Sequence, residues 1–182
     1  MKQINNLMKA SGIAALAAAL ILLFSANLPA ADSSNLLEVG EKAPNFKLKN
    51  SNGEKMSLKD FKGTPTVVYF YPKDDTPGCT TEACSFRDNF SSYEENNIDV
   101  IGISYDSPES HQAFKEKYNL PFTLLSDTKK KVAKKYGADR QPNNNVAKRI
   151  TYLLDADGKV VKVYPDVTPD GHAAEILAAY SN

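Results

Sequence analysis

Hydrophobic residues along the chain form two kinds of repeating pattern. Residues 66–71, Thr-Val-Val-Tyr-Phe-Tyr, are a continuous β-branched and aromatic run, which is typical of a strand buried on both faces. After Pro77, apolar residues recur three or four positions apart from Ala83 to Tyr93, which is typical of a helix that begins near Cys79. The two patterns then alternate, with further strands expected at 99–106 and 122–127 and further helices at 107–119, 129–137 and 168–182.

Two other segments alternate apolar and polar residues around a turn. Residues 46–58 do so around Asn52-Gly53 and residues 149–164 around Asp157-Gly158, and each pattern predicts a β-hairpin. The order is therefore hairpin, three strand–helix pairs, hairpin and helix. Such alternation favours an α/β fold with parallel strands in the centre, to which the closing hairpin adds antiparallel strands. We expect a thioredoxin-like fold: a central mixed β-sheet flanked by helices, with an N-terminal β-hairpin.

The first 31 residues have the composition of a secretory signal peptide. Lys2 and Lys9 lie before an apolar stretch at 12–26, and small residues follow it. The apolar stretch is shorter than the roughly 20 residues that a membrane-spanning helix needs. We therefore predict cleavage near Ala30 or Ala31 and export of a single domain, residues 32–182, to the periplasm if the source is bacterial. The alternative is a protein that stays anchored to the membrane by its N-terminal helix.

The charge of the chain is balanced, with 22 basic and 22 acidic residues in 182. Removal of Lys2 and Lys9 with the signal peptide leaves 20 against 22, a formal charge near −2. A balance of this kind argues against nucleic acid as a partner, because nucleic-acid binding needs a basic surface. The lysine-rich segment 129–137 is predicted to be the solvated face of a helix rather than a binding patch.

The chain has only two cysteines, Cys79 and Cys84, and both fall at the start of the helix that follows strand 66–71. The first backbone N–H groups of a helix have no partner within it, and the helix dipole is positive there. Both effects favour the thiolate form of a cysteine in the first turn. The carboxyl end of a central strand is also where open α/β sheets place their active sites. Cys79 is therefore a candidate nucleophile.

The spacing of the two cysteines bears on whether they form a disulfide. Residues five apart in an ideal helix have Cα atoms about 8.6 Å apart, whereas disulfide-bonded Cα atoms are rarely more than about 7 Å apart. A Cys79–Cys84 bond therefore requires the first turns of the helix to unwind, which favours a redox pair. A structural disulfide, as expected in an oxidising compartment, is the main alternative. His111 and His172 do not give zinc-ligand spacing with the cysteines and are predicted to be solvated helix residues.

Residues 71–88, "YPKDDTPGCTTEACSFRD", resemble the active-site segment of peroxiredoxins, in particular the peroxiredoxin Q group, also called bacterioferritin comigratory protein. The family pattern Pro-x-x-x-Thr-x-x-Cys is met by Pro72, Thr76 and Cys79. Cys84 matches the second cysteine of that group, and Arg149 falls where the active-site arginine of the family is expected. The likeness runs from about Leu37 to the C-terminus.

This resemblance implies a thiol-dependent peroxidase that acts in antioxidant defence without a metal, haem or flavin cofactor. Cys79 would attack hydrogen peroxide or an organic hydroperoxide and become a sulfenic acid. Cys84 would then resolve it by forming an intramolecular Cys79–Cys84 disulfide, which a thioredoxin-like thiol donor reduces. A resolving cysteine in the same chain makes a monomer the expected state. The exported leader departs from the usual cytosolic members and leaves the identity of the donor open.

The resemblance also implies roles for the remaining residues of the motif. Thr76 would place the thiolate and the peroxide through its hydroxyl, and Pro72 would shield the site from water. Arg149 would supply a fixed positive charge that stabilises charge on sulfur and oxygen. Gly78 would let the substrate approach the backbone closely, and Glu82 would hold the arginine. Asp74 and Asp75, which precede Thr76 in the loop before the helix, are predicted to be turn residues.

Two other functions remain open from the residues alone. One is an exported thiol–disulfide oxidoreductase, although the Cys-x-x-Cys motif of such proteins is absent here. The other is a redox sensor or holdase, in which a Cys79–Cys84 disulfide would change a binding surface. Consumption of peroxide separates the peroxidase from both, and reduction of disulfides in a protein substrate identifies the oxidoreductase.

Overall fold

A mixed β-sheet with helices on both faces forms the centre of the computed structural model, which describes residues 35–142 and 145–180. These residues belong to one structural unit, Ser33–Asn182. The predicted signal peptide, residues 1–31, lies outside the described residues. Within the described ranges, no helix is both long enough and apolar enough to cross a membrane.

In chain order the elements are β1 (Lys47–Asn50), β2 (Lys55–Ser57), a short 3₁₀ helix (Leu58–Phe61), β3 (Thr66–Phe70), α1 (Pro77–Asp88), α2 (Phe90–Glu95), β4 (Asp99–Ser104), α3 (Pro108–Tyr118), β5 (Thr123–Ser126), α4 (Lys131–Lys135), β6 (Ile150–Leu154), β7 (Val160–Tyr164) and α5 (His172–Tyr180). Each strand run predicted from hydrophobic patterning is present, and both predicted hairpins form, as β1–β2 and β6–β7.

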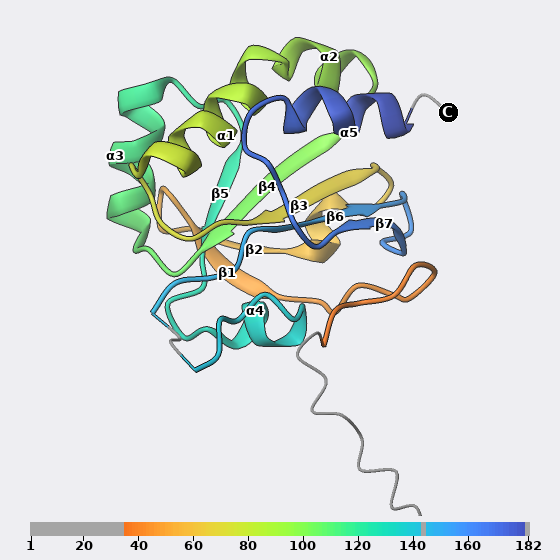
Figure 1. The fold of residues 1–182 in the computed structure, drawn as a ribbon, viewed down its shortest axis with the longest axis horizontal. Coiled ribbons are helices and arrows are strands. Elements are labelled where there is room, and N and C mark those ends of the chain that lie inside the picture. Colours follow the sequence, from red (N-terminus) through yellow and green to blue (C-terminus); the bar gives the residue numbers. More distant parts are fainter. Residues whose placement is uncertain (1–34, 143–144, 181–182) are drawn as a thin grey trace, which may run out of the picture. The chain divides into compact units, whose positions relative to one another are not determined.

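The sheet has the strand order β2-β1-β5-β4-β3-β6-β7. β3, β4 and β5 are parallel neighbours, as expected for strands joined by helices. β6 pairs with β3 and β1 pairs with β5, both in antiparallel orientation. The predicted thioredoxin-like α/β fold with a mixed sheet is therefore confirmed. The carboxyl ends of the three parallel strands meet at one edge of the sheet, which Figure 1 shows below α1 and α3.

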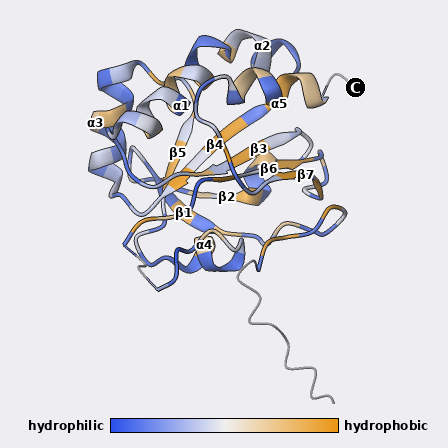
Figure 2. Ribbon diagram, viewed as in Figure 1, coloured by the Kyte–Doolittle hydropathy of each residue, from blue (hydrophilic) through white to orange (hydrophobic). Residues whose placement is uncertain are grey.

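Two apolar layers cover the two faces of the sheet. One face packs against α1, α2, α3 and α5, and the other packs against α4 (Figure 1). Successive residues of β3 point to opposite faces: Val67 and Tyr69 belong to the first layer, and Val68 and Phe70 to the second. All five residues of β3 are buried, which explains the continuous run of β-branched and aromatic residues, and the orange, hydrophobic segments of Figure 2 gather in the central strands of the sheet. Burying each large apolar side chain contributes about 1.5–3 kcal/mol.

Three helices differ in extent from the predictions, and one of them, α5, begins at His172 rather than at residue 168. The helix expected from Cys79 onward divides at Asn89, which lies between α1 and α2. The Asn89 side-chain amide donates to the carbonyl of Ser85 at 2.9 Å, so this side chain competes with the backbone for a helical acceptor. The lysine-rich helix is only Lys131–Lys135, because left-handed backbone at Lys130 and Gly137 bounds it on both sides.

The prediction that both histidines are solvated is wrong. His111 is 0 % exposed and His172 is 1 % exposed. His172 begins α5, and its Nε2 lies 2.9 Å from the hydroxyl of Thr151 in β6. Periodicity of apolar residues cannot identify such positions, because a polar side chain in the core interrupts the pattern that marks the buried face.

Candidate active site

Cys79 lies in the first turn of α1, directly beyond the carboxyl end of β3. Pro77 begins the helix, where its missing N–H costs no hydrogen bond, and Thr76 precedes it in extended conformation as the N-cap residue. The Cys79 side chain is buried against the aromatic layer that includes Tyr69 and Tyr71. Cys79 is a free thiol in this structure, as is the half-buried Cys84.

Arg149 contacts the cysteine directly. Its Nη2 atom donates a hydrogen bond to the sulfur of Cys79 at 3.3 Å, although the two residues are 70 positions apart. Strand pairing accounts for this contact. Ile150 of β6 lies opposite Phe70 at the end of β3, so the preceding residue reaches the edge of the sheet where α1 begins.

Glu82 completes a three-residue cluster. It lies one helical turn after Cys79 on the same face of α1, and its carboxylate forms an ion pair with Nη1 of Arg149. The guanidinium therefore connects the carboxylate and the sulfur. Burial works against the charge on Arg149, but Glu82 and Cys79 outweigh it and raise the pKa of the arginine. The positive charge beside the sulfur is thus secure.

The carboxyl group of Glu82 is in an unfavourable environment for a charge. It is 0 % exposed, and its second oxygen has no hydrogen-bond partner among the described residues. Burial raises the pKa of Glu82 to about 7, even though Arg149 acts in the opposite direction. Charged Glu82 therefore costs stability that the protonated form does not.

Replacing Glu82 with glutamine should change how stability depends on pH. The ordinary pKa of this carboxyl is 4.5. Between about 4.5 and 7 the folded state binds more protons at Glu82 than the unfolded state does, so this contribution to stability is full below 4.5 and is lost as pH rises through 7. Glu82→Gln lacks the titration. We expect the unfolding free energy of the wild type, relative to the variant, to fall by at least about 1 kcal/mol over that range.

Urea unfolding of both proteins at a series of pH values from 4.5 to 8 measures this difference. Parallel stability curves for the wild type and Glu82→Gln would contradict the assignment of a raised pKa to Glu82.

Gly78 makes room for the guanidinium. A Cβ atom at this position would lie 3.3 Å from Nη2 of Arg149 and 3.7 Å from Cγ of Pro169. The first of these distances is tighter than ordinary van der Waals contact. A side chain at position 78 would therefore press on the arginine that contacts Cys79, so the need for glycine here is steric.

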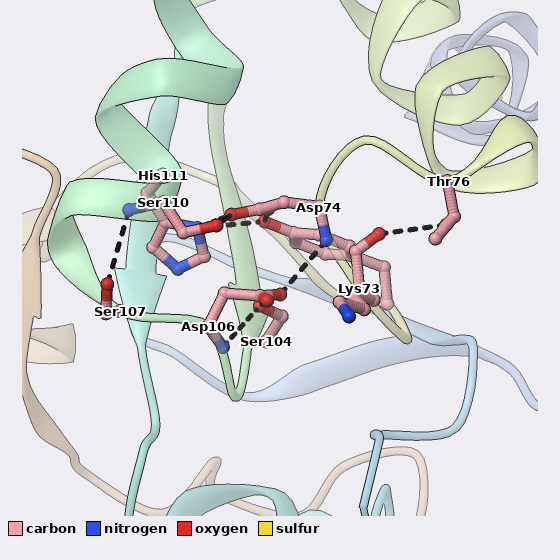
Figure 3. A network of polar contacts seen from close by, with 9 residues as sticks. Lys73, Asp74, Thr76, Ser104, Asp106, Ser107, Ser110 and His111 are labelled. Carbon is pink, nitrogen blue, oxygen red and sulfur yellow. Dashed lines mark hydrogen bonds and ion pairs between the residues drawn. The ribbon is translucent and has the colours of Figure 1, made fainter.

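The structure places Pro72 and Thr76 in the loop between β3 and α1. Pro72 is half-buried at the start of this loop. The Thr76 hydroxyl donates to the carbonyl of Lys73 at 2.9 Å and so closes the loop (Figure 3). The acceptor side of that hydroxyl is not engaged by this bond. The structure thus gathers Cys79, Glu82, Arg149 and Gly78 into one cluster, whereas the hydroxyl of Thr76 is bonded to Lys73 in the preceding loop.

A second polar cluster, which the sequence did not reveal, holds the same loop. The carboxylate of Asp74 accepts hydrogen bonds from Ser110 and His111, at 2.7 and 2.9 Å (Figure 3). It also accepts one from the hydroxyl of Tyr71 at 2.7 Å. Its backbone N–H donates to Asp106 at 3.0 Å. As predicted, Asp74 lies in a turn, but it is also only 7 % exposed, and its side chain joins the loop to the first turn of α3.

This network fixes the loop from which α1 begins. Asp106 is itself held by the hydroxyl of Ser104 at the end of β4, so the loops that follow two neighbouring parallel strands are joined. Asp74 lies between Lys73 and Thr76, whose mutual bond closes the loop. The sequence signal was weak, because two adjacent aspartates before a helix suit a turn equally well.

Asp74→Asn should destabilise the protein by about 2 kcal/mol, because a neutral amide offers one acceptor oxygen and turns an NH₂ group toward buried donors. We also expect slower peroxide reduction, the activity that the sequence resemblance implies, since the loop that carries Thr76 loses its anchor. Asp75→Asn is the matched control: Asp75 is exposed, pairs with Lys117, and has left-handed backbone that asparagine tolerates. Urea unfolding and peroxide assays measure both effects. Equal losses in the two variants would contradict a special role for Asp74.

A cavity of about 310 Å³ borders Arg149 on the side of the loop that follows β7. Val167 and Pro165 supply apolar wall, and Arg140 and Lys148 supply positive charge. Room of this size beside the arginine can hold the body of an organic molecule. Among the described residues, no three His, Cys, Asp or Glu side chains are grouped so that they could hold a metal ion.

Comparisons with known proteins agree on one family. The model of the AhpC/TSA family matches residues 39–163. The chain is 50 % identical over 146 residues to a Coxiella burnetii protein provisionally named peroxiredoxin bcp, an alignment that covers 78 % of this chain and 97 % of that protein. The fold of this chain is similar to that of Peroxidoxin BcpB from Mycobacterium tuberculosis, with a TM-score of 0.75 and 33 % identity. The match covers 80 % of this chain and 97 % of the Mycobacterium tuberculosis chain.

A further solved structure is that of the Xanthomonas campestris bacterioferritin comigratory protein, described in connection with its alkyl peroxide reduction activity. It matches with a TM-score of 0.70 and 29 % identity, over 81 % of this chain and 97 % of that one. The sequence and structure comparisons thus lead to the same group of proteins.

Proposed function

Because the chain belongs to the AhpC/TSA family, in the peroxiredoxin Q (Bcp) group, it is a thiol-dependent peroxidase, and we propose that Cys79 is its peroxidatic cysteine. The observation that carries this proposal is the hydrogen bond from Arg149 to the sulfur of Cys79. The N-terminus of a helix and an adjacent guanidinium are both features that favour the nucleophilic thiolate.

In the first step the Cys79 thiolate attacks the terminal oxygen of a hydroperoxide. The S–O bond forms as the O–O bond breaks, which gives a sulfenic acid and an alkoxide or hydroxide that takes a proton to leave as alcohol or water. Negative charge moves from sulfur to the departing oxygen. Arg149 donates one hydrogen bond to Glu82 and one to Cys79. Because Glu82 holds the guanidinium in place, Arg149 can stabilise that charge without reorganisation.

In the second step Cys84 attacks the Cys79 sulfenic acid, the disulfide forms and water leaves. Both cysteines lie in α1, one intact helix, and are five residues apart. Because that spacing exceeds the reach of a disulfide in a regular helix, we propose that the first turns of α1 unwind at this step. A thioredoxin-like dithiol then reduces the disulfide, and the helix re-forms.

We propose that organic hydroperoxides are substrates as well as hydrogen peroxide. The cavity beside Arg149 has room for an organic group, and the similar Xanthomonas campestris protein is described by its alkyl peroxide reduction. The resolving cysteine lies in the same chain, which supports catalysis by a monomer.

We also propose that the protein is exported. The support is the basic, apolar and small-residue order of residues 1–31, which suits a cleaved signal peptide. The mass of the protein recovered from the periplasm of a bacterial host tests this directly. A mass that begins near Ala30 or Ala31 supports cleavage, whereas a full-length chain in the membrane fraction favours the anchored alternative.

Loss of hydrogen peroxide over time, with thioredoxin and thioredoxin reductase as the electron source, tests the peroxidase cycle. We expect continuous turnover coupled to thiol oxidation at one peroxide per dithiol. No loss above the background of the reductant would contradict it. Reduction of insulin disulfides without peroxide consumption would instead support the oxidoreductase alternative.

A further inference from the structure

A second and larger cavity lies away from the Cys79 cluster, where β5 ends. Its volume is about 530 Å³, and it is bordered by the β1–β2 hairpin, by Pro108 at the start of α3, and by α4. Figure 1 shows α4 close to β1 in this part of the molecule. Six lysines line the cavity, namely Lys47, Lys49, Lys55, Lys129, Lys131 and Lys135.

The lysines come from two distant parts of the sequence. Three belong to the N-terminal hairpin, and three belong to the segment around α4, which is largely blue, and so hydrophilic, in Figure 2. Segment 129–137 was predicted to be a solvated helix face from its own lysines alone, without the hairpin lysines that line the same cavity. The antiparallel pairing of β1 with β5, in which Lys49 lies opposite Ser126, brings the two sets together.

Acidic groups do not neutralise this cavity. Among the described residues that line it, Asp127 is the only acid, and its carboxylate accepts backbone N–H groups of Lys131, Val132 and Ala133. Glu109 does not line the cavity. Hydrogen bonds with Ser107 and with its own backbone lower the pKa of Glu109, and the charge of Lys49 lowers it to a smaller extent. Six lysines thus line the cavity with a single carboxylate, and Asp60 borders a neighbouring hollow that includes Lys47 and Lys55.

The remaining lining suits a bound molecule better than open solvent. Phe46, Leu48 and Val132 supply apolar wall, so the charges lie around a concave surface of low polarity, which strengthens their field. Ser126 also lines the cavity. It is 7 % exposed, and its buried hydroxyl has no hydrogen-bond partner among the described residues.

We propose that this cavity binds a small molecule that carries two or more phosphate-type negative charges. Ammonium groups are compact point charges that suit phosphate oxygens. Because the six lysines are spread over β1, β2, α4 and the turn before α4, a ligand with several charged groups contacts more of them than a single phosphate does. The volume is within the range of small-molecule sites. The site is separate from the peroxidase chemistry and does not depend on it.

Calorimetric titration of the full chain with inorganic tripolyphosphate at low ionic strength tests the proposal. We expect saturable binding that is tighter than that of orthophosphate and weakens as salt is added. The triple variant Lys47→Gln, Lys131→Gln, Lys135→Gln should bind at least about tenfold more weakly. The matched control, Lys62→Gln, Lys134→Gln, Lys159→Gln, removes the same charge from outside this cavity and should bind within about twofold of the wild type. Lys134 lies on the same helix, which makes the comparison strict.

Vesicles distinguish a free phosphate compound from a lipid headgroup as the source of the charge. Sedimentation with phosphatidylglycerol and with phosphatidylcholine vesicles compares the two triple variants, both of which keep the N-terminal apolar segment. Lysine-dependent binding to anionic vesicles identifies a headgroup, and lysine-dependent binding of tripolyphosphate alone identifies a soluble ligand. Absence of both, or equal losses in the two triple variants, overturns the proposal. Peroxidase activity of each variant shows that it has folded.

Discussion

Cys79→Ser is expected to lower peroxide reduction to the uncatalysed background. A serine hydroxyl stays protonated beside Arg149, so the chain loses the anionic nucleophile that attacks the O–O bond. The serine side chain is only slightly smaller than that of cysteine, and its hydroxyl oxygen can still accept the hydrogen bond that Arg149 donates, so the fold should be preserved. Peroxide loss with thioredoxin as donor, together with circular dichroism, measures both.

Cys84→Ser is the matched control, because it removes the other thiol of the same helix. The proposed cycle predicts that it still reduces about one equivalent of peroxide in a rapid first turnover and then slows. Full activity in Cys79→Ser, or loss of the first turnover in Cys84→Ser, would show that Cys79 is not the peroxidatic cysteine.

Arg149→Met is expected to reduce the second-order rate constant with peroxide by about 10²–10³-fold, the cost of removing one preorganised donor from a site where negative charge develops. The methionine keeps much of the side-chain volume but donates nothing to Cys79. It also leaves Glu82 without its partner, although protonation of that carboxyl limits the cost to folding. Competition kinetics against a peroxidase of known rate measure the change.

Two further substitutions separate charge from geometry. Arg149→Lys keeps the positive charge, but one ammonium cannot reach both Glu82 and Cys79 as the forked guanidinium does, so we expect most of the loss to remain. Arg140→Met removes a neighbouring arginine that borders the same cavity and contacts neither residue, so hydrogen peroxide reduction should stay within about twofold. Equal effects of Arg140→Met and Arg149→Met would reduce the role of Arg149 to general electrostatics.

Strands and hairpins were predictable from the sequence because their signals are local. Thr66–Phe70 is buried on both faces, so its apolar run is unbroken, and the hairpin turns carry glycine at left-handed positions. Pro108 at the start of α3 and the Ser107 cap, which accepts the N–H of Ser110, follow equally local rules. The length of α4 was not predictable, because the left-handed backbone at Lys130 delays the start of the helix within a run of lysines that shows no local signal for it.

The candidate site divides in the same way. Cys79 and Glu82 lie one turn apart on one helix, so their proximity could be inferred from spacing. Arg149 was placed only by resemblance to a family, since its contact with Cys79 depends on the register of β6 against β3. The link between Asp74 and His111 depends on how α3 packs over the loop, and no local pattern encodes it. The six-lysine cavity likewise exists only because β1 pairs with β5.

In the proposed reaction cycle the first turns of α1 unwind, and Cys79 and Cys84 then form a disulfide. The most direct test of this cycle is to mix the reduced protein with one equivalent of hydrogen peroxide, trap remaining thiols by alkylation, and map the peptides by mass. The proposed cycle predicts that both cysteines escape alkylation and are joined within a single chain. Alkylated Cys84 beside a sulfenic or sulfinic Cys79, or a disulfide between two chains, would contradict it.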